Sequence, residues 1–421
     1  MTSLTITAAD GSGRKVGQRE FIVLMATLMS LNALAIDAML PALDEIASTF
    51  AIDDPNRRQL VVGVYLLATG FGSLVPGLFA DRFGRRPVLF VSLAIYLAAS
   101  LLCMFAPSFE ILLALRAAQG FGTAGLMVLP AAIIRDRFDG DAMARLISMI
   151  FIVFMAVPVL APTLGQIVLT FASWEWIFFA LALFGIGAAA WAAKRLPETL
   201  DPRHRQKIDP RTIVHNLPLT FRTREAVGYV LAAGLTFGAV FGYINSAQQL
   251  IGEHFGAEEQ FPLIFGASAA TLAFSSFANS RIVERFGARR VSHTALIAFI
   301  LVSVVQVYAA EVHADSLAWF FPLISINLCL LGFLGANFGS IAMQPFFDSA
   351  GAASSVQSAI RMLLGAVMGI AIGQAYDGTA LPLAIALLAS SLIALALVLF
   401  SERGKLFTRP RKPRYITESP H

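Results

Sequence analysis

Residues 31–41, LNALAIDAMLP, place one carboxylate, Asp37, in a stretch that is otherwise almost wholly apolar. A carboxylate at the centre of a membrane helix costs about 2.5–3.5 kcal/mol on insertion scales, so it needs a partner, water or a chemical role. Arg116 stands in a second apolar stretch at a comparable depth. If both face one cavity, each offsets the burial of the other, and a proton, an incoming cation and Arg116 compete to influence Asp37. This predicts ion-coupled exchange, with Asp37 as the proton-coupling group and Arg116 as its electrostatic partner.

The composition supports the membrane setting. The chain has 421 residues, of which 57% are hydrophobic and only 14% are charged, and its mean hydropathy is +0.72. These values exclude a soluble globular protein. Between short charged patches lie apolar runs near the roughly 20 residues that a helix needs to cross a bilayer. We therefore expect an all-α membrane protein with twelve transmembrane helices, at residues 20–41, 58–80, 88–105, 110–133, 144–168, 174–193, 226–249, 262–283, 292–310, 316–341, 355–376 and 381–401.

Basic residues predict the orientation of these helices. Arginine and lysine gather before the first expected span, in alternate connectors such as DRFGRR and RIVERFGARR, and along the tail. The other connectors, such as APSFE and EVHADS, contain none. Because positive residues stay on the cytoplasmic side, we expect both termini in the cytoplasm. Only Arg57 and Arg58 break the pattern on the outer side.

The chain divides near its middle. Residues 194–225 form the one long polar connector, which predicts a cytoplasmic linker between two six-helix bundles at 1–193 and 226–402, with a tail at 403–421. The two halves also resemble each other, because FADRFGRRP follows the second span and IVERFGARR follows the eighth. A repeat shifted by six spans keeps its orientation, which is the layout of an alternating-access carrier.

The first of these loops, Gly77-Leu-Phe-Ala-Asp-Arg-Phe-Gly-Arg-Arg86, is similar to the G-x-L-a-D-r-x-G-r-r signature of the major facilitator superfamily. In that family the motif latches the outward-open state. The resemblance therefore implies the major facilitator fold, and it implies a conformational latch made by the motif's glycines and charged residues. These residues are Gly77, Asp81, Arg82, Gly84, Arg85 and Arg86.

Two further motifs narrow the resemblance. LRAAQGFGTAG around Arg116 resembles the family's R-x-x-q-G helix, and residues 161–166, APTLGQ, resemble the antiporter signature G-P-x-x-G-G with two glycines replaced. Pro158, Pro162 and Gly165 would then belong to an antiporter helix that seals one bundle against the other. With DAMLPALDEIASTF and LPAAIIRDRF, these features resemble the Bcr/CflA family of drug-proton antiporters. Some multidrug relatives carry a second acidic residue where this chain has Met29.

Polar residues inside other spans are candidates for lining a substrate cavity. They are Asn32, Tyr65, Tyr243, Asn245, Asn327, Gln357 and Arg361. Arg361 lies six residues into its expected span, where it could contact an anionic or zwitterionic substrate group or extend to the cytoplasmic interface.

Each motif also has a plainer interpretation. Asp37 could simply end its helix before Pro41, and Arg116 could extend to the outer surface. The glycine-arginine loop could be a basic turn, and the prolines of the fifth span could make an ordinary kink. The polar residues could form hydrogen bonds between helices.

The resemblance implies a proton-coupled transporter that exports amphipathic small molecules or drugs across a bacterial inner membrane, in contact with lipid and as a monomer. A proton-coupled importer is the main alternative, and a membrane enzyme or a receptor is a weaker one. The six histidines lie in loops, in the tail or at a span's edge, and the chain has no H-E-x-x-H, G-x-S-x-G or phosphate-binding loop. We therefore expect no enzyme activity, no metal and no cofactor besides the coupling proton. The positive loops already follow from topology, so they give no reason to expect nucleic-acid binding.

Overall fold

The computed structural model describes residues 5–7, 15–54, 56–138, 143, 146–147, 149–150, 153–154, 156–205, 221–346 and 350–407. Most of the expected linker, much of the first part of the expected span 144–168, and the tail from residue 408 lie outside this set. The described residues are predominantly helical, as expected of an all-α protein.

The first half begins with a small antiparallel hairpin, in which β1 (Thr5–Thr7) pairs with β2 (Lys15–Gly17). Helices follow, separated by short turns. They are α1 (Gln18–Asp37), η1 (Leu40–Ala42), α2 (Leu43–Thr49), η2 (Arg57–Gln59), α3 (Leu60–Gly72), α4 (Pro76–Phe83), α5 (Arg85–Cys103), α6 (Phe109–Arg135), α8 (Ala156–Phe171), α9 (Glu175–Arg195) and η3 (Pro202–His204).

The second half contains six long helices. They are α11 (Arg224–Gln248), α12 (Phe261–Phe286), α13 (Ala288–Val312), α14 (Leu317–Met343), α15 (Ala350–Gln374) and α16 (Leu381–Ser401). The end of α11 continues into a π-helical turn, η4 (Gln249–His254), and a short 3₁₀ turn, η5 (Glu258–Gln260), precedes α12.

Ten of the described helical segments are long and apolar enough to cross a membrane, and a bent pair brings the number to eleven. The bent pair occupies the expected span 58–80, which α3 and α4 cover with a bend of 43°. Pro76 is the first residue of α4 and explains the break, because its ring has no N–H to donate and crowds the preceding turn. The described α8 has only 16 residues, so it counts as a shorter apolar helix.

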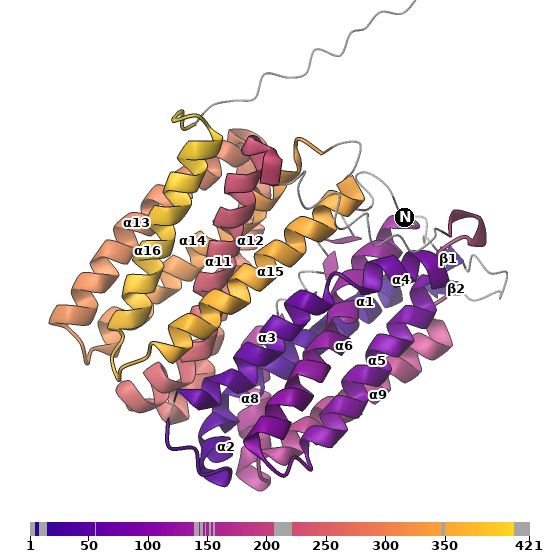
Figure 1. The fold of residues 1–421 in the computed structure, drawn as a ribbon, viewed down its shortest axis with the longest axis horizontal. Helices are drawn as coiled ribbons and strands as arrows, with labels where there is room; N and C mark the ends of the chain where they lie inside the picture. Colours follow the sequence, from indigo (N-terminus) through magenta and orange to yellow (C-terminus); the bar gives the residue numbers. More distant parts are fainter. Residues whose placement is uncertain are drawn as a thin grey trace, which may run out of the picture.

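The helices of the two halves form two groups that lie side by side (Figure 1). We call the end of the molecule where α1 begins and α16 ends the terminus side, and the other end the opposite side. On the terminus side, Arg195 at the end of α9 pairs with Glu20 at the start of α1 at 2.6 Å. On the same side, Arg224 at the start of α11 donates to the carbonyl oxygen of Phe400 near the end of α16 at 2.9 Å.

The internal repeat seen in the sequence has a structural counterpart. Gly84 joins α4 to α5 with a φ of +104°, and Gly287 joins α12 to α13 with a φ of +83°. Such backbone angles are strained for any residue with a Cβ atom, so both positions require glycine for the one-residue turn. The same tight connection therefore recurs in each half.

Close helix packing depends on small residues within the spans. A Cβ atom at Gly120 of α6 would lie 2.3 Å from the carbonyl oxygen of Tyr65 in α3, and this contact involves backbone. The two halves meet along α3 and α15 and along α8 and α12. In a bilayer such close backbone approach is a main source of helix association.

We predict that Gly120→Ala destabilises the protein by about 1–3 kcal/mol, because the backbone of α3 cannot make room for the added methyl group without moving. Melting in a mild detergent measures this effect. Gly187→Ala is the matched control, since no atom lies within 4 Å of a Cβ atom at that position of α9. The control should melt at the wild-type temperature or above, and equal behaviour of both variants would refute the packing argument.

Candidate functional site

A cavity of about 1250 Å³ lies between the two groups of helices, lined by residues of both. Most of its lining is apolar, and its charged residues are Asp37, Asp81, Arg85, Arg135, Asp136, Arg137, Asp201 and Arg361. All of these except Asp37 and Arg361 lie at helix ends or connectors of the terminus side. Among the described residues, none from a connector of the opposite side lines the cavity. The cavity therefore reaches the terminus side and stops short of the opposite one.

Asp37 is the last residue of α1 and lies in the cavity wall. Its side chain is buried, with a residue exposure of 4%. Within the described part of the chain, its carboxylate makes no hydrogen bond or ion pair with protein. A carboxylate in this position can exchange a proton or meet a cation only through the cavity.

Arg116 is fully buried and connects three helices of the first half. Its guanidinium donates to the carbonyl oxygens of Val61 in α3 at 2.9 Å and of Ala35 in α1 at 3.0 Å. It also donates to Gln119 Oε1 at 2.5 Å and lies 4.4 Å from the centre of the Tyr65 ring. Arg116 thus does not extend to the surface. Within the described residues it forms no direct ion pair with Asp37, and it is linked to that residue only through the backbone of α1.

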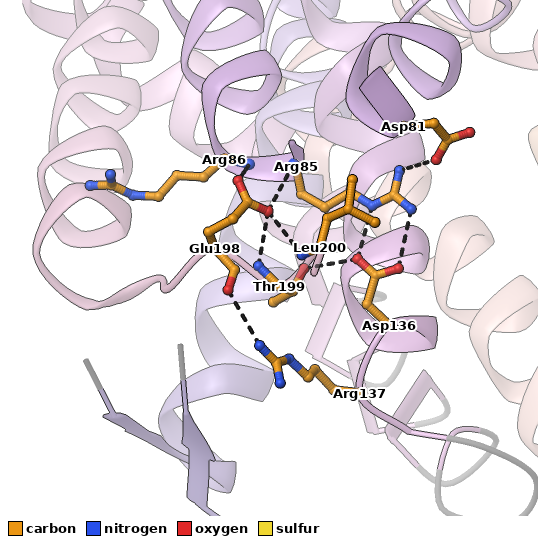
Figure 2. A network of polar contacts seen from close by, with 8 residues as sticks. All are labelled: Asp81, Arg85, Arg86, Asp136, Arg137, Glu198, Thr199 and Leu200. Atoms are coloured by element: carbon orange, nitrogen blue, oxygen red, sulfur yellow. Dashed lines mark hydrogen bonds and ion pairs between the residues drawn. The ribbon is translucent and has the colours of Figure 1, made fainter. Parts of the chain in front are cut away.

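The loop motif forms a polar network on the terminus side (Figure 2). Arg85 donates to Asp81 at 2.5 Å and to both carboxylate oxygens of Asp136, which follows α6, at 2.9 and 3.1 Å. Thr199 also donates to Asp136 at 2.9 Å. Arg82 is exposed at the end of α4.

Glu198, just beyond α9, caps the first turn of α5 (Figure 2). Its carboxylate accepts the backbone N–H groups of Arg85 at 2.9 Å and Arg86 at 3.0 Å, and those of Thr199 and Leu200. A carboxylate is favoured there by the partial positive charge of a helix N-terminus. The Arg86 guanidinium donates to the Ala193 carbonyl oxygen at 2.9 Å. These contacts all lie within the first half, where they join the motif to α9 and to residues 198–200 that follow it.

The opposite side carries a different polar cluster, which joins the two halves. The guanidinium of Arg58 binds Asp44 of α2 through one nitrogen and Glu253 of η4 through another. The amide of Gln248, at the end of α11, donates to the second oxygen of Asp44. Arg58 is buried, whereas Arg57 is half-exposed and pairs with Glu110 of the same half at 3.3 Å. We call this cluster the clasp; its residues are Asp44, Arg58, Gln248 and Glu253. The clasp explains why Arg58 is found on the side expected to be the outer one, where the distribution of basic residues predicts none.

A second set of hydrogen bonds lies beside the clasp. Asn56, before α3, donates to the carbonyl oxygens of Gln374 and Tyr376 at 3.2 and 2.7 Å. In return, the side chain of Gln374 donates to the Asn56 carbonyl oxygen at 2.6 Å, and Gln249 donates to Asn56 Oδ1 at 3.1 Å. The two halves are therefore held together on the side that the cavity does not reach.

The antiporter-motif residues lie on α8, which packs against α12 of the second half. Pro158 lines the cavity, and Pro162 and Gly165 are buried. A Cβ atom at Gly165 would lie 2.1 Å from the carbonyl oxygen of Ala38, the residue after Asp37. This helix therefore touches the turn that follows the cavity carboxylate.

The structure separates the polar residues expected to line the cavity into two groups. Asn32, Tyr243 and Arg361 are in the lining, as are Gly77, Asp81 and Arg85 of the loop motif. The remaining four expected residues lie outside the lining: Tyr65, Asn245, Asn327 and Gln357.

Those four make hydrogen bonds inside the protein. Tyr65 donates to Asn32 Oδ1 at 3.0 Å and so holds a residue that does line the cavity. Asn327 donates to Gln306 Oε1 at 2.5 Å, and Gln357 donates to the Ala342 carbonyl oxygen at 3.2 Å. Asn245 donates to a carbonyl oxygen of its own helix. The contacts of Tyr65, Asn327 and Gln357 match the plainer interpretation of such residues as hydrogen bonds between helices, whereas that of Asn245 stays within α11.

Four acidic residues that complete the two polar clusters were not among the site residues expected from the sequence, namely Asp136, Glu198, Asp44 and Glu253. The isolated pair Arg57 and Arg58 was the available signal for the clasp, because an arginine that is buried on a side without other basic residues needs acidic partners. Within the described residues, no group of three or more His, Cys, Asp or Glu side chains is placed to hold a metal ion.

Comparison with known proteins agrees with the motifs. A bicyclomycin resistance protein homolog of Haemophilus influenzae is 29% identical over 367 residues, covering 86% of this chain and 91% of the relative. The multidrug resistance protein MdtL of Escherichia coli is 27% identical over 396 residues, covering 91% of this chain and 96% of MdtL. Both names agree with the resemblance to the Bcr/CflA family.

Solved structures share the fold at low identity. A D-xylose-proton symporter superposes with a TM-score of 0.70 at 15% identity, covering 92% of this chain and 99% of the symporter. The human organic anion transporter MFSD10 superposes with a TM-score of 0.65 at 17% identity, covering 91% of this chain and 99% of that one. The matched proteins are named as transporters or resistance proteins, in agreement with the expectation that this chain is not an enzyme.

A family model described as Major Facilitator Superfamily matches residues 25–373, which is well over half of the chain. With the helical fold, the cavity between two groups of helices and these relatives, the match identifies the chain as a multi-pass membrane transporter that belongs to the major facilitator superfamily.

Proposed function

We propose that this transporter exports amphipathic small molecules across a bacterial inner membrane in exchange for protons, as a monomer with its terminus side in the cytoplasm. The basic connectors support this orientation, since Arg85, Arg86, Arg195 and Arg224 all lie on the terminus side. The names of the two resistance relatives support export.

The observation that carries the proposal is the position of Asp37. Its carboxylate lies in the wall of a mostly apolar cavity that reaches the terminus side, and no described residue pairs with it. A buried group of this kind gains a proton or a cationic partner more readily than it stays charged alone. A proton on Asp37 and a cargo in the cavity would therefore influence each other, as exchange requires.

In the proposed cycle, this structure is the inward-facing state. Cargo enters from the cytoplasm and Asp37 releases its proton into the cavity. The clasp then opens, the two halves rock, and cargo leaves on the outer side while Asp37 takes up an outside proton. In the outward-facing state the loop motif would exchange contacts within its own half for contacts with the second half. One charge moving through 100 mV supplies about 2.3 kcal/mol for this cycle.

Asp37→Asn should abolish transport driven by a pH gradient, because an amide cannot carry the proton, while the folded yield stays at the wild-type level. The measurement is flux in liposomes under an imposed pH gradient, with the compound that a screen of amphipathic dyes and drugs shows the wild type to move fastest. Glu311→Gln, which changes an exposed acid of α13, is the control and should transport normally. Wild-type pH-driven flux in Asp37→Asn would overturn the proposal, and uptake instead of release from right-side-out vesicles would make the protein an importer.

Arg116→Lys should destabilise the protein by about 1.5–3 kcal/mol for each charged hydrogen bond that is lost, because an ammonium cannot reach α1 and α3 together as the planar fork does. It should also lower pH-driven flux, since the bond to Ala35 positions the end of α1. Thermal melting and liposome flux test the two effects. If both equal the wild-type values, Arg116 has neither role.

Arg58→Gln should shift the population toward the state that is open on the opposite side, because Asp44 and Glu253 lose the cation that joins the two halves. Spin labels at the exposed positions Asp53 and Glu259, in protein without its two native cysteines, would report longer distances. Arg57→Gln is the matched control, since Arg57 pairs only within the first half in the described contacts. Unchanged distances in Arg58→Gln would show that the clasp does not hold this state.

A further inference from the structure

Arg361 lies in the wall of the cavity. Helix α15 begins at Ala350, and among the described residues its stretch that is apolar enough to cross a membrane begins at Val356, five residues before Arg361. From the sequence, the side chain could contact cargo or extend to the cytoplasmic interface, and in the structure it faces the cavity.

The guanidinium of Arg361 has unused hydrogen-bonding capacity. A guanidinium carries five N–H donors. The hydrogen bond of this group within the described residues is a long one, from Nη2 to Ser358 Oγ at 3.3 Å, and no described carboxylate pairs with it. The group lies 5.0 Å from the centre of the Phe237 ring, which leaves its edge exposed to an incoming acceptor.

Three other arginines near the cavity or in the clasp have several acceptors in the protein, although the Nε of Arg58 has none. Arg85 binds two carboxylates, Arg58 binds two carboxylates, and Arg116 binds three oxygen acceptors. Because a cation inside a mostly apolar cavity is costly without an acceptor, the difference at Arg361 indicates an acceptor that comes from outside the protein.

The surroundings of Arg361 suit an amphipathic molecule. The lining on the same half is rich in apolar and aromatic side chains, namely Phe237, Phe241, Tyr243, Phe265 and Met362. Gly339 of α14 leaves room beside the guanidinium, since a Cβ atom there would come within 3.3 Å of Arg361 Nη1. One cationic fork beside an aromatic wall is the arrangement that binds an anionic oxygen group attached to an apolar body.

We propose that Arg361 is the anion-binding group of this transporter and that its cargo is an amphipathic organic anion. The proposal rests on the proposed function, because it takes the occupant of the cavity to be the exported molecule. An anionic cargo also suits export, since an inside-negative potential drives both the outward movement of an anion and the inward movement of a proton. Asp37, the last residue of α1, lines the same cavity and carries the coupling proton.

Binding of three naphthalene compounds with permanent or absent charge tests this proposal: naphthalene-1-sulfonate, naphthalene-1-sulfonamide and naphthylmethyl-trimethylammonium. Affinity is measured by calorimetry and by thermal stabilisation of the full chain in an uncharged detergent. The wild type should bind the sulfonate at least about tenfold more tightly than the other two, and Arg361→Gln should lose this preference. Arg361→Lys keeps the positive charge but lacks the planar guanidinium, so it should keep part of the preference for the sulfonate.

Arg135→Gln is the matched control, because Arg135 lines the same cavity at the terminus-side end of α6. It should keep the preference for the sulfonate. The proposal is overturned if the wild type binds the three compounds alike, if Arg361→Gln keeps the preference, or if Arg135→Gln loses it equally. Binding and pH-driven flux are separate readouts. Flux of neutral or cationic compounds without sulfonate binding refutes the anion site alone, whereas sulfonate binding without any pH-driven flux refutes the proposed function alone.

Discussion

The absence of water from the hydrocarbon core is the constraint on which the rest of this structure depends. Every buried charge must find a partner in the protein or face an aqueous cavity. Arg116 meets this requirement with two backbone carbonyls and a glutamine, and Arg85 meets it with two carboxylates. Among the described residues Asp37 has no hydrogen-bond partner and Arg361 has only a long hydrogen bond to Ser358, and both face the cavity. The same rule that stabilises the bundle thus separates structural charges from those available to a proton or a cargo.

The buried charges at the two ends of the molecule find their partners in different places. On the opposite side, Arg58 and Asn56 join one half to the other. On the terminus side, the described contacts of Asp81, Arg85, Asp136 and Glu198 stay within the first half. A buried ion pair gains little net free energy, since its attraction offsets the cost of desolvation. Ion pairs of this kind can therefore stabilise one conformation of the transporter and still be replaced by other ion pairs when the two halves move.

The helices around the cavity connect its wall to these ends. Gly165 of α8 contacts the turn after Asp37, and Arg116 holds the carbonyl of Ala35 two residues before it. The end of α1 is thus fixed from two sides by rigid helices. A movement of α8 relative to α12 would therefore displace the turn after Asp37, which couples the movement of the two halves to the position of the carboxylate in the proposed exchange.

The sequence by itself was sufficient for the membrane class, for the approximate position of most helices, for the loop motif and for the superfamily, because each depends on local composition or short spacing. Even the bend at Pro76 had a local cause. The sequence could not pair Arg58 with Glu253, 195 residues away, or Arg85 with Glu198, 113 residues away. It also could not decide whether Arg116 faces Asp37 or α3, nor which polar residues line the cavity. Only the tertiary structure decided these points, because the rotation of each helix and the pairing of distant charges follow from how whole helices pack.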